Sequence, residues 1–332
     1  MSSDTAGGAF AFCIFYHSAT LVTMILVTGV NGFVGKHLAR ELHGRGLDVF
    51  GVGNNEPGAH PEIVSILEKY VQCDITKADE VSRLDLNYVS CVINLAGLAN
   101  VGASFDNPDL YMDVNVKVLY VLGEELYKQN PGARMIAVST GALYDPNQEM
   151  PLNESSKVIE TGSPYALSKL AMEKIAEELR QKGQDCTVVR PFNHIGPGQG
   201  LGFLVPDLIE KLRQADKNNP KITAGNIKTV RDYTDVRDIA RAYADLAAAE
   251  KLNHGLYNVC SGNGKSGEEI LQSICKNLDI DFGKLQIDID QSLIRPTDPA
   301  RIVGDHTRLT EDTSWNSTIA LDKTINDIIT SL

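Results

Sequence analysis

The feature that most constrains this chain is a set of spaced glycines directly after a short apolar segment near the start of the sequence. Residues 24–28 have the length and composition of a buried strand, Gly29-Val-Asn-Gly-Phe-Val-Gly35 follows at once, and a helical pattern then ends near Gly44. In such a unit the glycines let the backbone approach a pyrophosphate at the helix N-terminus. The pattern favours a dinucleotide-binding unit over a plain packing turn. Its predicted cofactor contacts are Gly29, Asn31, Gly32, Phe33, Val34 and Gly35.

Further strand-type segments alternate with helical ones up to residue 190. These strand-type segments are residues 48–53, 70–73, 89–95, 134–140 and 185–190. The alternation predicts an α/β fold with a Rossmann-type doubly wound parallel sheet.

The elements become shorter and more mixed after residue 190. We therefore expect a dinucleotide-binding domain over residues 24–190 and a smaller C-terminal α/β substrate-binding domain mainly over 191–332, with segments around 225–260 returning to the first. Residues 1–23 have neither the basic start of a secretory signal nor the length of a membrane span. We interpret them as a loose extension whose removal leaves activity intact.

The end of the second predicted strand bears on the choice of cofactor. An NAD enzyme usually places an acidic residue there, whereas this chain has Gly53-Asn54-Asn55. No carboxylate repels a 2′-phosphate and no arginine attracts one, so we favour NADP over NAD and leave use of both open. Asp74 suits either an adenine contact or a helix N-cap, and Asn115 either a buried structural amide or a group near the site. The cofactor contacts predicted outside the glycine turn are Asn54, Asp74, Ile75, Leu95, Ala96, Gly97, Asn115, Ser139, Tyr165, Lys169 and Pro191.

A tyrosine and a lysine lie four residues apart on a predicted helix that starts at Ser163-Pro164. A phenol has a pKa of about 10, and a nearby ammonium lowers it. Tyr165 and Lys169 alone would suit any surface helix. Beside a dinucleotide site, they and Thr140 predict proton transfer next to a nicotinamide.

Composition excludes several classes of partner. The net charge is −12 and no cluster of Lys or Arg is present, which argues against nucleic acid. The six cysteines are scattered without metal-like spacing, so we interpret them as reduced thiols of a cytoplasmic protein. His194 lacks partner ligands, and we predict no metal site and no membrane contact.

Taken together, these motifs resemble the extended short-chain dehydrogenase/reductase (NAD-dependent epimerase/dehydratase) family of nucleotide-sugar enzymes. The longer blocks 189–199, 231–237, 257–262 and 295–305 are most similar to members that reduce the C4 ketone of GDP-4-dehydro-6-deoxy-D-mannose to GDP-D-rhamnose. The resemblance implies that Tyr165 donates the proton, Lys169 assists it and Thr140 binds the oxygen, with Ser139 as its neighbour. It also implies that Asn193 contacts a GDP-linked sugar, that Arg231 and Arg295 bind its phosphates, and that the chain forms a homodimer.

One departure separates activities within that family. The 4,6-dehydratases place Asp-Glu directly after the catalytic threonine, whereas this chain has Gly141-Ala142 and so lacks the acid and base of dehydration. A nucleotide-sugar 4-epimerase of UDP-hexose type, with retained NAD, is the nearest alternative. A non-catalytic NADP-binding redox sensor is a remote one. The configuration at C4 of the product, rhamno or talo, is left open.

Overall fold

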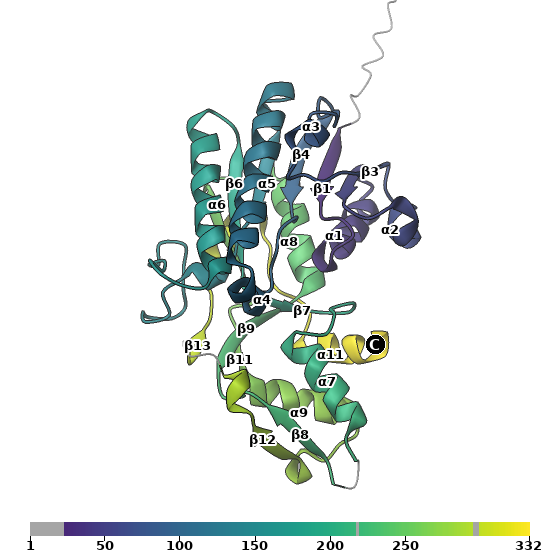
Figure 1. The fold of residues 1–332 in the computed structure, drawn as a ribbon, viewed down its shortest axis with the longest axis vertical. Helices are drawn as coiled ribbons and strands as arrows, with labels where there is room; N and C mark the ends of the chain where they lie inside the picture. The colour runs from purple at the N-terminus through teal and green to yellow at the C-terminus, as the bar shows by residue number, and fades with distance from the viewer. Residues whose placement is uncertain (1–22, 217–218, 295–298) are drawn as a thin grey trace, which may run out of the picture.

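The computed structural model describes residues 23–216, 219–294 and 299–332, and its largest feature is a seven-stranded sheet (Figure 1). The strand order is β10-β6-β5-β4-β1-β2-β3, and every neighbouring pair is parallel. The strands are β1 (Met24–Thr28), β2 (Val49–Gly53), β3 (Lys69–Gln72), β4 (Val89–Asn94), β5 (Arg134–Val138), β6 (Cys186–Pro191) and β10 (Leu256–Val259). The prediction of a Rossmann-type doubly wound parallel sheet is confirmed.

Side chains of each strand alternate between two separate cores, because successive residues of a strand point to opposite faces. In β1, Ile25 and Val27 join one core and Leu26 joins the other. In β5, Ile136 joins the first core, and Met135 joins the second. Both faces of the sheet are therefore buried, as a near-continuous apolar strand requires.

Helices cover both faces. The first core is closed by α1, α8 and α10, and the second by α3, α5 and α6. The long helices are α1 (Phe33–Gly44), α5 (Pro108–Gln129), α6 (Pro164–Gln181) and α8 (Val236–Ala248), and the short ones are α2 (Pro61–Val64), α3 (Ala78–Val81), α4 (Val101–Asp106) and α10 (Thr307–Thr313). Both α8 and β10 thus pack in the same layers as elements that precede residue 190.

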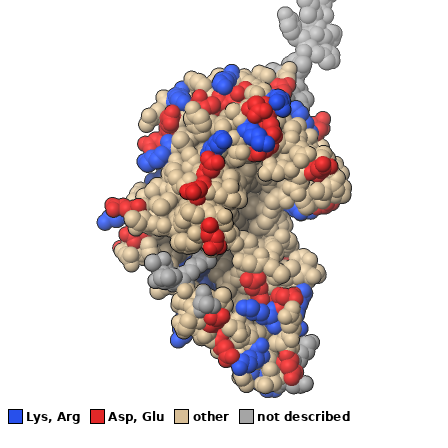
Figure 2. Space-filling view, viewed as in Figure 1, with Lys and Arg blue, Asp and Glu red and all other residues tan. Residues whose placement is uncertain are grey.

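A second, smaller α/β region occupies the lower part of Figure 1 and has a core of its own. Its strands are β7 (Asn193–Ile195), β8 (Lys221–Ala224), β9 (Val230–Asp235), β11 (Gly264–Ser266), β12 (Gln286–Ile289) and β13 (Arg301–Ile302), and its helices are α7 (Leu204–Gln214), α9 (Gly267–Asn277) and α11 (Leu321–Ser331). Strand β9 pairs with β7, β11 and β13, and β8 pairs with β12. The surface is hollowed where this region meets the larger one (Figure 2).

Some predictions concern residues outside the described part of the chain. The extension predicted over residues 1–23 lies almost entirely there, as do Cys13 and the predicted phosphate ligand Arg295. The remaining five cysteines are buried and unpaired. In the described part of the chain, no helix combines the length and the apolar character that crossing a bilayer requires.

Candidate active site

The glycine turn between β1 and α1 is tightly packed, because the Gly29 carbonyl oxygen lies close to Gly32 and Gly35. Gly29 has φ +65, and a Cβ on Gly35 would lie 2.2 Å from the Gly29 carbonyl oxygen. Gly32 is the N-cap of α1, and no side chain caps that end. The free N–H groups of the first helical turn therefore face the carboxyl edge of the sheet, where an anion is favoured.

The other predicted residues of the turn connect it to neighbouring elements. Asn31 Nδ2 donates to the Tyr70 hydroxyl at 2.8 Å, and Asn31 Oδ1 is buried without a partner among the described residues. The Phe33 ring stacks on His194 with centroids 6.1 Å apart, and Val34, in the first turn of α1, packs against the first core. The turn therefore carries an unpartnered amide oxygen, and the residue that follows it contacts strand β7.

The carboxyl ends of β1 and β4 are joined by side chains at the point where the strand order reverses. Thr28 Oγ1 donates to Asn94 Oδ1 at 2.6 Å and accepts from the Ala96 N–H. Leu95 packs in one core and Ala96 in the other, and exposed Gly97 follows. Ligands of doubly wound sheets bind at such a reversal point.

Asn115 of α5 is a buried amide whose bonds all go to protein groups. Its Oδ1 accepts from Leu98 N–H at 2.7 Å, and its Nδ2 donates to the Leu98 carbonyl and to Ser168 Oγ. It thus ties the loop after β4 to helix α6. These contacts fit a structural amide, and the bond to Ser168 also places Asn115 beside the helix of Tyr165 and Lys169.

Helix α6 begins as the sequence predicts, and this start places the tyrosine. Ser163 Oγ accepts from the Ala166 N–H, and Pro164 is the first helical residue. Tyr165 is 7% exposed and meets the Tyr111 ring edge-on. Burial raises the pKa of Tyr165, and a hydrogen bond from Thr140 acts in the opposite direction. Tyr165 and Thr140 are therefore brought together.

Lys169 lies one turn after Tyr165 and is also buried. Its Nζ donates to the Val138 carbonyl at 2.8 Å, at the end of β5. Burial lowers the pKa of Lys169 to about 8, and Glu173 acts to raise it. At pH 7 the Lys169 side chain is therefore mostly an ammonium ion, but its pKa lies only about one unit above that pH.

A buried ion pair that the sequence did not reveal lies beside Lys169. Arg190 Nε and Nη2 donate to the two oxygens of Glu173 at 2.8 and 2.6 Å, and Ser139 Oγ donates to Glu173 Oε1 at 2.6 Å. Ser139 is therefore next to Thr140 in the chain but directed to Glu173. A Glu four residues after a Lys resembles an ordinary helical pair, so only the three-dimensional contact with Arg190 reveals it.

The end of β2 is filled by side chains from its neighbours. Tyr70 donates to the Asn55 carbonyl at 2.5 Å, and the exposed Asn54 accepts at its carbonyl from Gln72. After β3, Asp74 Oδ1 accepts from the N–H and hydroxyl of Thr76, and buried Ile75 joins the second core. The nearby helix α3 has Lys77 as its N-cap, so Asp74 stabilises the preceding turn and the N-cap reading is wrong.

The predicted substrate residues lie on β7 and β9, next to the end of β6 at Pro191. Asn193 is exposed and pairs with Tyr233 in the β7–β9 register. Arg231 donates to the Val230 carbonyl at 2.8 Å and has further contacts. His37 of α1 bonds the Pro197 carbonyl at 2.9 Å. These contacts bring the loop after Pro191 against the helix that follows the glycine turn.

Buried Asp232 organises the backbone around that region. Its oxygens accept from the N–H groups of Ser261, Gly262 and Gly304, and from the Ser261 hydroxyl. Burial raises the pKa of Asp232, and these four bonds oppose the rise. We interpret Asp232 as an anchor for two loops, the one after β10 and the one after β13, rather than a ligand.

The residue after Thr140 is tightly packed. Gly141 begins a short 3₁₀ helix, η2 (Gly141–Leu143), and a Cβ there would lie 2.9 Å from the ring of Phe192. A carboxylate side chain at this position would displace that ring. The packing around Gly141 therefore favours glycine over the aspartate that a dehydratase has at this position.

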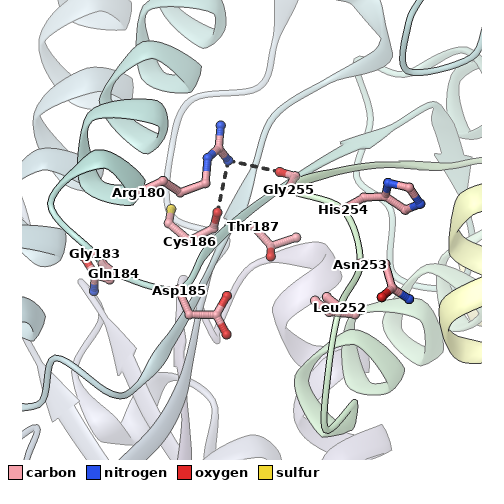
Figure 3. Close-up of a pocket in the computed structure, with 10 residues that line it drawn as sticks. All are labelled: Arg180, Gly183, Gln184, Asp185, Cys186, Thr187, Leu252, Asn253, His254 and Gly255. Carbon is pink, nitrogen blue, oxygen red and sulfur yellow. Dashed lines mark hydrogen bonds between the residues drawn. The ribbon is translucent and has the colours of Figure 1, made fainter.

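Two surface hollows lie away from these residues. One of about 440 Å³ lies at the amino ends of β6 and β10 and is lined by Arg180, Asp185 and His254 among others (Figure 3). Arg180 is in the last turn of α6 and Tyr165 in its first, about 22 Å apart at 1.5 Å per residue. The other, of about 720 Å³, lies on the outer face of α5 and α6. Neither coincides with the Tyr165 site.

The chain is similar in sequence to enzymes that act on nucleotide sugars. Residues 25–260 match the NAD dependent epimerase/dehydratase family. The chain is 30% identical over 314 residues to GDP-6-deoxy-D-mannose reductase of Pseudomonas aeruginosa, covering 92% of this chain and 95% of the relative.

Two solved structures share the fold over nearly their full lengths. RMD from Pseudomonas aeruginosa, solved with NADPH, has a TM-score of 0.77 and 26% identity and covers 93% of this chain and 98% of that one. UDP-glucose 4-epimerase from Bifidobacterium longum, solved with NAD⁺ and UDP, has a TM-score of 0.80 and 25% identity with the same coverage. Similarity therefore extends both to a reductase and to an epimerase.

Proposed function

The chain belongs to the NAD dependent epimerase/dehydratase family, and from this premise we propose that it reduces the C4 ketone of a nucleotide-activated 6-deoxyhexose. The substrate we propose is GDP-4-dehydro-6-deoxy-D-mannose and the product GDP-D-rhamnose. The observation that carries the proposal is the buried group of Thr140, Tyr165 and Lys169. The residue directly after Thr140 is Gly141, where a dehydratase has a carboxylate. The similarity to a GDP-6-deoxy-D-mannose reductase supports the nucleotide and the sugar.

The residues present fit a nicotinamide dinucleotide. The uncapped start of α1 suits the pyrophosphate, and the unpartnered Asn31 Oδ1 suits a ribose hydroxyl. Lys169 and the segment Leu95–Gly97, which approach each other at the carboxyl edge of the sheet, would hold the nicotinamide end. When bound, the reduced cofactor supplies the hydride. We favour NADPH because the residues at the end of β2, Gly53-Asn54-Asn55, include no acidic side chain.

The chain's own residues handle the proton. Tyr165 donates its phenolic proton to the C4 oxygen, and Thr140 donates a hydrogen bond to the same oxygen as charge develops on it. The phenolate that remains is buried, which opposes its formation. We propose that the Lys169 ammonium, one helical turn away, offsets part of that cost, because an opposite charge stabilises the ionised form. Asn193 and Arg231 are proposed to hold the sugar and its diphosphate.

Dehydration does not suit this site. Elimination of water across C5 and C6 needs an acid and a base, and Gly141-Ala142 provides neither. A longer side chain at position 141 would also require the Phe192 ring to shift. Simple carbonyl reduction needs only the groups that Tyr165, Thr140 and Lys169 contribute.

The decisive experiment supplies the keto-sugar directly. GDP-mannose is converted by a 4,6-dehydratase, and the chain is then added with NADPH or NADH while absorbance and the NMR spectrum of the product are followed. We expect stoichiometric cofactor oxidation and a GDP-6-deoxyhexose with the rhamno configuration at C4. Isomerisation of a UDP-hexose without added cofactor, with no reaction of the keto-sugar, would establish the epimerase instead. Binding of NADPH without either reaction would favour a redox sensor.

We also propose that the chain is a cytoplasmic homodimer. The five described cysteines are unpaired, which fits a reducing compartment. The outer face of α5 and α6 exposes large apolar side chains, among them Leu110, Met112 and Tyr120, around the hollow described above. Apolar patches of this kind mark protein interfaces, and two-fold dimers are the commonest assemblies.

Charging this face is expected to separate the subunits. In a Leu110→Lys/Tyr120→Lys variant, two ammonium groups per subunit would have to be buried, so light scattering should give the mass of one chain where the wild type gives two. The matched control is Ile289→Lys, because Ile289 is similarly exposed on β12, outside the α5–α6 face. An unchanged mass in the double variant would place the interface elsewhere.

A further inference from the structure

Glu173 continues a row of functional side chains along one face of α6. Tyr165, Lys169 and Glu173 follow one another at intervals of four residues, so they lie on adjacent turns. The Glu173 side chain is only 12% exposed and that of its partner Arg190 only 6%. A buried carboxylate therefore lies one helical turn from Lys169 and two turns from Tyr165.

Both oxygens of Glu173 are fixed by groups from other elements. Arg190 of β6 binds them in a two-pronged contact, and Ser139, directly after β5, donates to Oε1 at 2.6 Å. The residue before Ser139 is Val138, whose carbonyl accepts from Lys169 Nζ at 2.8 Å. Consecutive residues at the end of β5 thus position the carboxylate and the ammonium relative to each other.

The Lys169 ammonium is buried, and burial disfavours a charged group that has no opposite charge near it. Burial lowers the pKa of Lys169 to about 8, and the charge of Glu173 acts against this lowering. Titratable groups on the neighbouring elements are Tyr165, one turn earlier on α6, Tyr111 of α5, whose ring meets that of Tyr165, and Arg190 of β6, which is bound to Glu173. The end of β5 faces it with a carbonyl. Glu173 therefore supplies the nearby negative charge.

Arg190 is held independently of Lys169. Its guanidinium carbon lies 4.7 Å from the centre of the Tyr144 ring, and Tyr144 bonds Asn258 of β10 at 2.7 Å. An ion pair that served only to join α6 to β6 would leave the charge state of Lys169 unchanged when both partners are removed. This difference separates a positioning role from a purely structural one.

We propose that Glu173, fixed by Arg190 and Ser139, is a positioning residue that keeps Lys169 charged and thereby sets the alkaline limit of the reaction. The second half of this statement rests on the proposed reductase function. The first half concerns the unliganded chain and is tested without substrate.

The direct test is a titration of Lys169 by NMR in the unliganded chain labelled with ¹³Cε-lysine, with the resonance assigned by its loss in Lys169→Met. We expect Lys169 in Glu173→Gln to titrate at lower pH than in the wild type. Because Glu173→Gln leaves Arg190 buried and unpaired, it is compared with Glu173→Gln/Arg190→Met, which restores a neutral interior. The double variant is expected to recover thermal stability but to keep the shifted titration. Glu177→Gln, the same change on an exposed residue of the same helix, should leave it unchanged.

The kinetic test follows kcat/KM for keto-sugar reduction against pH in the same variants. The alkaline fall in rate should begin at lower pH in both Glu173 variants, and one unit of displacement corresponds to about a tenfold loss well above the pKa. Glu173→Asp, which keeps the charge, should recover part of the wild-type profile. A Lys169 titration that is unchanged in the double variant overturns the proposal, as does a shifted titration with an unmoved rate profile. A wild type that does not reduce the keto-sugar instead contradicts the proposed function, and the NMR titration still decides the role of Glu173.

Discussion

Replacing Tyr165 with phenylalanine is expected to lower turnover of the keto-sugar by about 10²- to 10⁴-fold, the usual contribution of a general acid. The substitution removes one hydroxyl from a residue that is already buried against the Tyr111 ring, so the packing of α6 should survive. The C4 oxygen would then receive its proton only from water or Thr140. The measurement is kcat under saturating NADPH, together with the dissociation constant of NADPH from fluorescence.

A neighbouring tyrosine provides the matched control. Tyr111→Phe removes the same atom from a ring in edge contact with Tyr165, and its hydroxyl donates to the Asn100 carbonyl instead of facing Thr140. Its turnover should stay within a few-fold of the wild type. NADPH affinity should be nearly unchanged in both variants. Near-normal turnover in Tyr165→Phe would remove this residue from the mechanism.

Replacing Gly35 with alanine is expected to impair both folding and cofactor binding. The new methyl group would lie 2.2 Å from the Gly29 carbonyl oxygen and 2.8 Å from the backbone of Val30. Neither group can rotate away, so α1 must move from the turn. Overpacking of this kind costs about 1–3 kcal/mol of the free energy of unfolding, and we expect the upper end. Chemical denaturation measures that loss, and NADPH titration should show weakened binding.

Gly44 of the same helix offers a control, because alanine there is expected to raise the free energy of unfolding instead of lowering it. Gly44 is the last residue of α1, and a Cβ there would meet no atom within 4 Å. Alanine should therefore leave cofactor binding unchanged and add up to about 1 kcal/mol of stability, because it restricts the unfolded chain. If Gly35→Ala bound NADPH as tightly as Gly44→Ala, the turn would not form the pyrophosphate site.

Local patterns in the sequence predict the framework of the site well. The apolar run before Gly29 becomes β1, and the Ser163-Pro164 pair begins α6 at the predicted residue. In both places the relevant contacts lie within a few residues of one another along the chain. The spacing of Tyr165 and Lys169 likewise places them on one face.

Contacts between distant segments could not be predicted in this way. The bond of Ser139 to Glu173 spans 34 residues and that of Asn31 to Tyr70 spans 39. Nothing in the local composition around Glu173 or Tyr70 distinguishes them from exposed residues of the same type. Asp74 was ambiguous for a related reason, since a short polar side chain after a strand suits a turn, a cap or a ligand equally well.

The position of α8 and β10 in the large sheet has a consequence for synthesis. Leu38 and Leu42 of α1 share a core with Ile239 and Leu246 of α8, so they stay uncovered while the nascent chain ends near residue 191. At 5–20 residues per second the ribosome needs roughly 3–11 s to add the residues up to 246. During that interval the face of α1 that later packs on α8 lacks this partner, so the first core is completed only after α8 has been synthesised.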